Sequence, residues 1–148
     1  MVELTDGRLM LNCRNHRGPP DQGKTRNHRL ISLSDDGGLT WSAARPDPAL
    51  PEPICQASLI RCFSSTQTDR PWLLFSNPAD KQKRRNLTVR LSKDDGNSWP
   101  HSKVLYPGSA AYSCLAMLPS GDAACLYECD GSGRIALATF SLDWLTSE

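Results

Sequence analysis

The chain has 148 residues, of which 39% are hydrophobic, and a formal net charge of +1 at pH 7. These values are typical of one globular domain, and the near-neutral charge argues against the basic surface that binding to nucleic acid or an anionic membrane requires. No apolar run approaches the roughly 18 residues that a membrane-spanning helix needs. The first residues lack the basic and long apolar regions of a secretory signal, so the sequence leaves the cellular compartment open.

Short apolar segments alternate with turn residues along the whole chain, which contains 11 prolines and 10 glycines. The first few residues fit the middle of a strand that leads into a turn, and the Pro-rich residues 43–53 predict a long surface connection. Helical periodicity is almost absent, so the pattern predicts an all-β sandwich, barrel or propeller. The expected strands cover residues 8–13, 29–34, 57–63, 72–76, 87–92, 112–118, 123–128 and 135–142.

Several of these segments are apolar on both faces. Trp72, Leu73, Leu74 and Phe75, for example, follow one another without a polar residue between them. A strand of this kind fits a sheet that is covered on both sides, as the blades of a propeller are.

The chain contains an internal repeat with the pattern S-x-D-x-G-x-[TS]-W, which occurs at residues 34–41 and 92–99. A repeat at this spacing is typical of propellers and solenoids. In each copy the aspartate can accept hydrogen bonds from its own turn, and the glycine can adopt a positive φ at little steric cost. The repeat therefore predicts two structural turns, formed by Ser34, Asp36, Gly38, Trp41, Ser92, Asp94, Gly96 and Trp99.

Six cysteines are present, at positions 13, 55, 62, 114, 125 and 129. No two of them have the C-x-x-C spacing of a zinc site, and most lie inside apolar runs. Buried free thiols are the favoured interpretation, although an even count also permits disulfides. We expect no metal and no cofactor.

The two repeated turns are similar to the Asp boxes of the sialidase (neuraminidase) family, which also occur in several unrelated propellers. Four other segments resemble exo-α-sialidase motifs in the family's order, at residues 6–15, 84–92, 108–113 and 125–128. The resemblance covers essentially the whole chain and is to the C-terminal portion of the catalytic domain. It implies a six-bladed β-propeller, of which residues 1–148 would form two to three four-stranded blades, as one partial domain with no second domain.

The family binds the carboxylate of the sialoside with three arginines. Arg14 matches the second of them and Arg84 the third, with Arg85 as the alternative if the register shifts by one residue. Arginine suits this role because its planar guanidinium is always charged and forms paired, charge-assisted hydrogen bonds with a carboxylate.

Tyr112 matches the family's nucleophile, and sialidases are known for using a tyrosine where most glycosidases use a carboxylate. A neutral phenol avoids the repulsion that a second carboxylate would feel from the substrate. Glu128 resembles the residue that orients the first arginine. Residues 119–122 form a strong turn sequence, and a hairpin folded about residue 120 places Tyr112 opposite Glu128 within one residue.

Other members of the family's site have no counterpart here. A hairpin folded about residue 6 places the partner of Arg14 just ahead of Met1, where the family has the glutamate that activates the tyrosine. The first arginine and the acid/base aspartate belong to earlier blades. We therefore expect a truncated chain that is inactive alone and whose partners include the missing N-terminal blades.

The resemblance predicts a glycoside hydrolase, a retaining exo-α-sialidase that removes terminal sialic acids from glycoconjugates. The ligand would be a sialylated glycan or free sialic acid. Two alternatives remain open at this point: a non-catalytic carbohydrate-binding or scaffold propeller, and a trans-sialidase that transfers the sugar to another acceptor.

Overall fold

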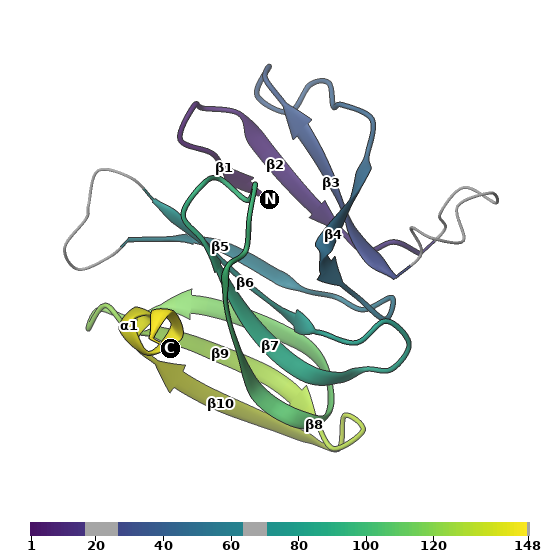
Figure 1. Ribbon diagram of the computed structural model, residues 1–148, viewed down its shortest axis with the longest axis vertical. Helices are drawn as coiled ribbons and strands as arrows, with labels where there is room; N and C mark the ends of the chain where they lie inside the picture. Colours follow the sequence, from purple (N-terminus) through teal and green to yellow (C-terminus); the bar gives the residue numbers. More distant parts are fainter. Residues whose placement is uncertain (17–26, 64–70, 148) are drawn as a thin grey trace.

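The computed structural model describes residues 1–16, 27–63 and 71–147, and this part of the chain contains ten strands and one short helix (Figure 1). The elements are β1 (Val2–Glu3), β2 (Leu9–Cys13), β3 (His28–Ser34), β4 (Arg45–Pro51), β5 (Ser58–Cys62), β6 (Trp72–Pro78), β7 (Arg85–Ser92), β8 (His101–Met117), β9 (Ala123–Cys129), β10 (Arg134–Phe140) and α1 (Leu142–Thr146). All pairings between adjacent strands are antiparallel. The all-β prediction is confirmed.

The first sheet has the strand order β1-β2-β3-β4. Val2 lies opposite Met10, so the β1–β2 hairpin has the predicted register. Gly7 closes the hairpin turn with a φ of 85°, which glycine tolerates best because it has no side chain.

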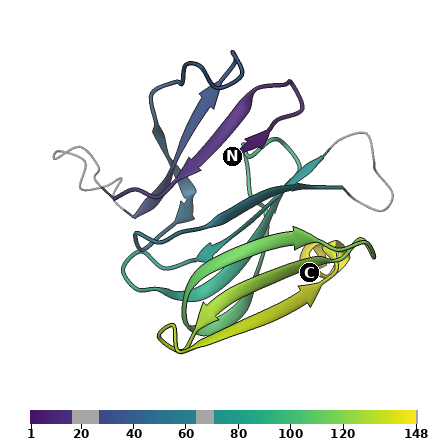
Figure 2. The same cartoon turned by 180° about the vertical axis from the view of Figure 1, so that it is seen from behind.

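The second sheet has six strands in the order β10-β9-β8-β7-β6-β5, and β8 belongs to two parts of it. The N-terminal half of β8 pairs with β7, while the C-terminal half pairs with β9. The sheet bends along this strand, so β5–β7 and β8–β10 lie as separate layers in the two opposite views (Figures 1 and 2). The molecule thus consists of three successive antiparallel units: β1–β4, β5–β8 and β8–β10.

The middle unit is buried on both faces. Leu73 and Phe75 on β6 belong to an apolar cluster with residues of the first sheet, whereas Leu74 belongs to a second cluster with β7–β10. Phe75 is fully buried, and its ring centroid lies 5.7 Å from that of Trp99. The apolar run in β6 therefore has the two-sided packing that its sequence predicts.

Both repeated turns are closed by side-chain hydrogen bonds. Asp36 accepts from the backbone N–H of Thr40 at 2.9 Å and from its hydroxyl at 2.6 Å, and the hydroxyl of Ser34 donates to Asp36 at 2.8 Å. Ser92, Asp94 and Ser98 repeat this pattern. Gly38 and Gly96 have φ values of 95° and 79°.

The two tryptophans of these turns behave differently. The indole N–H of Trp41 donates to the carbonyl of Gly38 within its own turn. That of Trp99 donates to Asp47 of the first sheet at 3.3 Å. The second turn therefore links two of the three units.

Three sequence-based assignments are wrong. Residues 43–53 contain strand β4, which pairs with β3 despite its prolines because it is the outer strand of its sheet. Strand β8 begins at His101, well before the predicted residue 112, because Pro107 and Gly108 lie where the β7–β8 register shifts. Strand β10 ends at Phe140, since Ser141 caps α1 through its side chain.

All six cysteines are free thiols. Cys55, Cys62, Cys125 and Cys129 are buried as predicted, and burial raises the pKa of Cys62 to about 12. Cys13 and Cys114 are exposed. In the part of the chain that the structure describes, no helix is long and apolar enough to cross a membrane.

We predict that Phe75→Ala destabilises the fold by about 3–5 kcal/mol, because it empties the contact between the first and second sheets. The matched change Leu126→Ala, at a side chain that is 48% exposed, should cost less than about 1 kcal/mol. Urea denaturation followed by tryptophan fluorescence measures both. Equal losses would contradict the assignment of Phe75 to the core.

The first repeated turn should stabilise the fold in a pH-dependent way. Hydrogen bonds from Thr40 and Ser34 lower the pKa of Asp36 below its ordinary value of 3.8. Because the pKa of Asp36 is lower in the folded than in the unfolded protein, its carboxylate stabilises the fold at pH values above the ordinary pKa of 3.8. This stabilisation decreases progressively as the pH falls below about 4. Asp36→Asn should therefore lower the unfolding temperature at pH 7 and have a smaller effect at pH 3. The neighbouring exposed Asp35→Asn should change it little at either pH.

Candidate functional site

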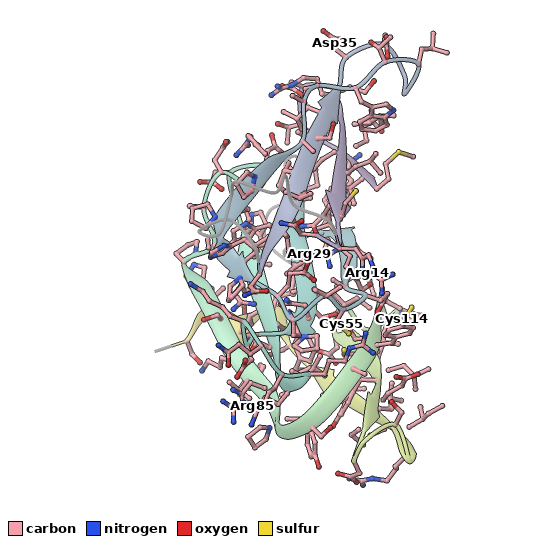
Figure 3. All side chains as sticks on the ribbon, turned by 90° about the vertical axis from the view of Figure 1, so that its right-hand side faces the viewer. Arg14, Arg29, Asp35, Cys55, Arg85 and Cys114 are labelled. Atoms are coloured by element: carbon pink, nitrogen blue, oxygen red, sulfur yellow. The ribbon has the colours of Figure 1, made fainter. Side chains whose placement is uncertain are left out.

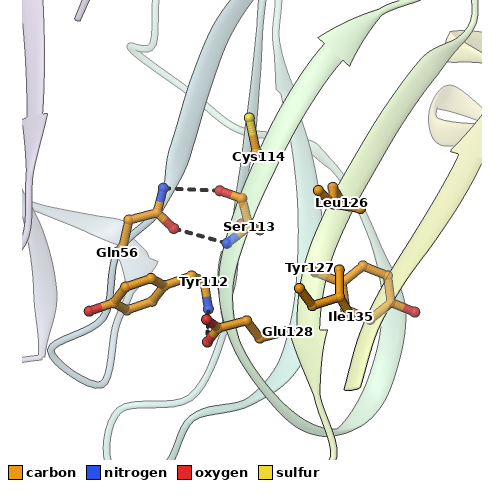
Figure 4. Close-up of a pocket in the computed structure, with 8 residues that line it drawn as sticks. All are labelled: Gln56, Tyr112, Ser113, Cys114, Leu126, Tyr127, Glu128 and Ile135. Carbon is orange, nitrogen blue, oxygen red and sulfur yellow. Dashed lines mark hydrogen bonds between the residues drawn. The ribbon is translucent and has the colours of Figure 1, made fainter. Parts of the chain in front are cut away.

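Tyr112 and Glu128 lie together at the open end of the β8–β9 hairpin (Figure 4). Tyr112 is 44% exposed and lies at a β-sheet irregularity between Ala110 and Ser113. Its backbone N–H donates to a carboxylate oxygen of Glu128 at 3.4 Å, and the hydroxyl of Ser132 donates to the same oxygen at 3.1 Å. The predicted juxtaposition of Tyr112 and Glu128 is confirmed.

Arg84 reaches the same place from another segment. It directly precedes β7, and its guanidinium carbon lies 5.7 Å from the centroid of the Tyr112 ring. One of its terminal nitrogens also donates to the carbonyl of Ile54 at 3.1 Å. The cation thus lies over the face of the phenol ring, where an exposed guanidinium can bind an anionic group beside Tyr112.

Arg85, the alternative to Arg84, takes a different direction. Its Nε lies 2.6 Å from a carboxylate oxygen of Asp80. The backbone N–H groups of Gln82 and Lys83, together with Arg85, hold the pKa of Asp80 at about 2. Figure 3 shows Arg85 at the opposite edge of the molecule from Arg14 and Cys114. Of the two arginines, only Arg84 contacts Tyr112 in this arrangement.

Arg14 is exposed and directly follows β2. The backbone N–H of the next residue, Asn15, donates to the Glu52 carboxylate at 2.6 Å. Glu52 is completely buried and also lies 3.3 Å from a guanidinium nitrogen of the buried Arg29. Burial lowers the pKa of Arg29, while the charge of Glu52 acts in the opposite direction.

Residues 52–56, which we call the connecting segment, run from the first sheet toward β5 and form hydrogen bonds with Asn15, Arg84 and Ser113. Gln56 donates to the carbonyl of Ser113 at 3.0 Å and accepts from its N–H at 2.9 Å, directly after Tyr112 (Figure 4). Ile54 receives Arg84, and Glu52 receives the N–H that follows Arg14. The connecting segment therefore brings the Arg14 stretch, Arg84 and Tyr112 into one region.

Three cavities border these residues. One of about 330 Å³ has a mostly apolar lining, to which Tyr112 and Glu128 belong. A second, of about 270 Å³, is lined by Asn15, His16, Asn27 and Ile54. A third, of about 580 Å³, is lined by Arg84 and Arg85 together with Lys83 and residues 107–109. Within the described ranges, no group of three or more His, Cys, Asp or Glu side chains could hold a metal ion.

Sequence reasoning missed Glu52, Ile54 and Gln56. Glu52 stands between two prolines in a stretch whose composition predicted solvated surface, and nothing local indicates that its carboxylate is buried against Arg29. The only available signal was its order in the chain, just ahead of the expected strand over residues 57–63.

Comparisons with known proteins identify the family of the chain. A family model described as a BNR repeat-like domain matches residues 1–125. A sialidase of Micromonospora viridifaciens is 42% identical over 147 residues, which are 97% of this chain and 21% of that protein. A sialidase of Bacteroides fragilis is 35% identical over 133 residues, covering 86% of this chain and 23% of that protein.

The chain belongs to the sialidase family. It spans only about a fifth of the length of the Micromonospora viridifaciens and Bacteroides fragilis sialidases.

Solved sialidase structures share the fold. A Hadza microbial sialidase, Hz136, superposes with a TM-score of 0.79 at 34% identity, over 95% of this chain and 26% of that one. A leech intramolecular trans-sialidase superposes with a TM-score of 0.78 at 26% identity, over 97% of this chain and 23% of that one. The predicted sialidase-type propeller is confirmed, with the three antiparallel units as successive parts of it.

We predict that Arg84→Ala changes the NMR chemical shifts of the Tyr112 ring protons, because it removes the cation over the ring. Arg85→Ala should leave those shifts unchanged and instead perturb the amides of Gln82 and Lys83, which share Asp80 with Arg85. Ring shifts that respond to Arg85 and not to Arg84 would reverse the assignment.

Proposed function

We propose that this chain supplies the nucleophile and two of the three carboxylate-binding arginines of an exo-α-sialidase site. The observation that carries the proposal is the placement of the Arg84 guanidinium over the Tyr112 ring, with Glu128 beside the backbone of the same tyrosine. These residues come from three separate segments, and each belongs to a stretch that resembles a sialidase motif. A scaffold propeller without chemistry would have no need of this convergence.

In this proposal Arg14 and Arg84 bind the carboxylate on the anomeric carbon of a terminal sialic acid. Paired guanidinium groups fix both the position and the orientation of a carboxylate, because each presents donors in a rigid plane. Both side chains are exposed and so remain available to a ligand. Glu128, which accepts from Ser132 and from the backbone of Tyr112, would orient a further arginine supplied from outside these residues.

Tyr112 would attack the anomeric carbon through its phenolic oxygen, and the bond from that carbon to the departing sugar oxygen would break. The phenol proton passes to a general base, and the departing oxygen takes a proton from a general acid. Water then attacks the anomeric carbon and gives its proton to the group that had acted as the acid, while the bond from that carbon to the Tyr112 oxygen breaks and this oxygen regains its proton from the base; the two displacements together retain the configuration. The base and the acid would come from propeller units beyond these 148 residues.

An apolar strip on the outer face of β8–β10 fits such additional units. Leu126, Ile135 and Leu137 are 48%, 68% and 63% exposed, and Leu126 lies directly opposite Leu137 in the sheet. The middle unit of the chain is covered on both faces by its neighbours, whereas this face of the third unit is open. A fourth antiparallel unit packed here would cover the strip and bring its own groups next to Tyr112.

Grafting tests the proposal. We predict that the Micromonospora viridifaciens sialidase remains active when the matching stretch is replaced by residues 1–148 of this chain, and that Tyr112→Phe in the graft lowers kcat roughly a hundredfold or more. The release of sialic acid from a sialoside measures activity. The chemical form of the released sugar separates hydrolysis from intramolecular transfer, the reaction named for the leech relative.

Tyr106→Phe is a matched control, because it removes a phenolic hydroxyl from the same strand, where that hydroxyl donates to Asp130. It should leave kcat within about twofold of the unmodified graft. A folded Tyr112→Phe graft with full activity would refute Tyr112 as the nucleophile.

A further inference from the structure

The connecting segment, residues 52–56, holds the main chain at two of the proposed functional residues and the side chain of a third. It has no assigned role in catalysis and contains no residue that was selected from the sequence. Its contacts are nevertheless directed at the stretches that carry Arg14, Arg84 and Tyr112.

Glu52 is the anchor of this segment. Its carboxylate is fully buried and is satisfied by the N–H of Asn15 at 2.6 Å, the N–H of Cys55 at 3.0 Å and the Arg29 guanidinium at 3.3 Å. A buried charge is stable only when paired and hydrogen-bonded in this way. Since Asn15 directly follows Arg14, the charge fixes the main chain from which the Arg14 side chain extends.

Ile54 lies in a backbone conformation that its side chain disfavours, with a φ of 57°. The next residue, Cys55, is held by two hydrogen bonds: its N–H donates to Glu52, and its carbonyl accepts from Arg29 at 2.7 Å. The carbonyl of Ile54 accepts from Arg84. Positive φ at a β-branched residue is typical of a position that its surroundings over-determine for a functional reason.

The side chain of Gln56 forms a pair of hydrogen bonds with β8, as the backbone of a neighbouring strand would. Its side-chain amide donates to the carbonyl of Ser113 and accepts from the N–H of Ser113, at the point where the β8–β9 register shifts. An irregular strand loses part of its regular pairing, and Gln56 restores two hydrogen bonds on the other edge directly after Tyr112.

We propose that the connecting segment is the positioning element of the carboxylate-binding site, with Glu52 acting through the main chain at Arg14 and Gln56 through the main chain at Tyr112. The three proposed functional residues come from different segments, so their mutual geometry depends on a part that contacts Arg84 and the residues directly after Arg14 and Tyr112. This inference rests on the proposed function for its meaning, while the positioning itself can be measured without it.

The test uses the 148-residue chain with Glu52→Gln and Gln56→Met, each close in size to the original residue. Glu3→Gln, at an exposed ion pair with Arg61, and Gln82→Met, at an exposed position, are the matched controls. Two quantities are measured: the Kd for N-acetylneuraminate by NMR titration, and hydrogen exchange at the amides of Asn15 and Ser113. Unfolding temperatures are recorded for all variants.

We expect Glu52→Gln to raise the Kd about tenfold and to speed exchange at Asn15, because a small displacement of a binding group costs much of its effect. Gln56→Met should raise the Kd and speed exchange at Ser113. The controls should change neither quantity. If Glu52→Gln fails to fold, Gln56→Met decides the matter, since it leaves the buried ion pair in place.

A folded Glu52→Gln or Gln56→Met variant with unchanged Kd and unchanged exchange overturns the positioning role. A lower unfolding temperature, with the Kd and the exchange rates at both amides unchanged as in the controls, also overturns it, because this result indicates a purely structural contact. The proposed function fails instead if the unmodified chain does not bind N-acetylneuraminate, or if it binds and Arg14→Ala leaves that binding intact. Exchange at Asn15 and Ser113 then decides the positioning role by itself.

Discussion

The structure depends on burying both faces of the β5–β8 unit. Leu73 and Phe75 pack toward the first sheet, and Leu74 packs toward β8–β10, so neighbouring residues of one strand hold the molecule together in opposite directions. A single sheet with one apolar face could lie anywhere on a core, whereas a sheet that is apolar on both faces must lie between two others. This constraint orders the three units along the chain and aligns their strand ends.

Aligned strand ends explain where the proposed functional side chains lie. Arg14 directly follows β2, Arg84 directly precedes β7, and Tyr112 occupies the irregular stretch of β8. At these places the regular backbone pairing stops, so side chains can turn toward a ligand without disturbing the core. The Asp-box turns stabilise the hairpins and the contact between units, but they do not contact Tyr112, Arg84 or Glu128 through any hydrogen bond described for them.

Much of the fold and part of the site could be predicted from sequence. Two-sided apolar runs, the repeated turns and the hairpin between Tyr112 and Glu128 depend on residues close together in the chain, and all three are seen in the structure. Two of the three errors in the strand assignments share one cause. Strand β4 and the start of β8 contain prolines that suggested connections, but partner strands β3 and β7 override that local preference. The motif favoured Arg84, but a register shift of one residue would have selected Arg85, since both stand in the same basic stretch.

The sequence by itself determined the all-β architecture, the family and the short-range pairings, because these follow from apolar periodicity, turn chemistry and motifs within a few residues. Only the tertiary structure decided that Arg84 faces Tyr112 while Arg85 pairs with Asp80. It alone placed Glu52 in the core against Arg29 and Gln56 against Ser113. The contacts of Arg84, Glu52 and Gln56 join residues more than twenty positions apart, whose partners become neighbours only when the chain has folded.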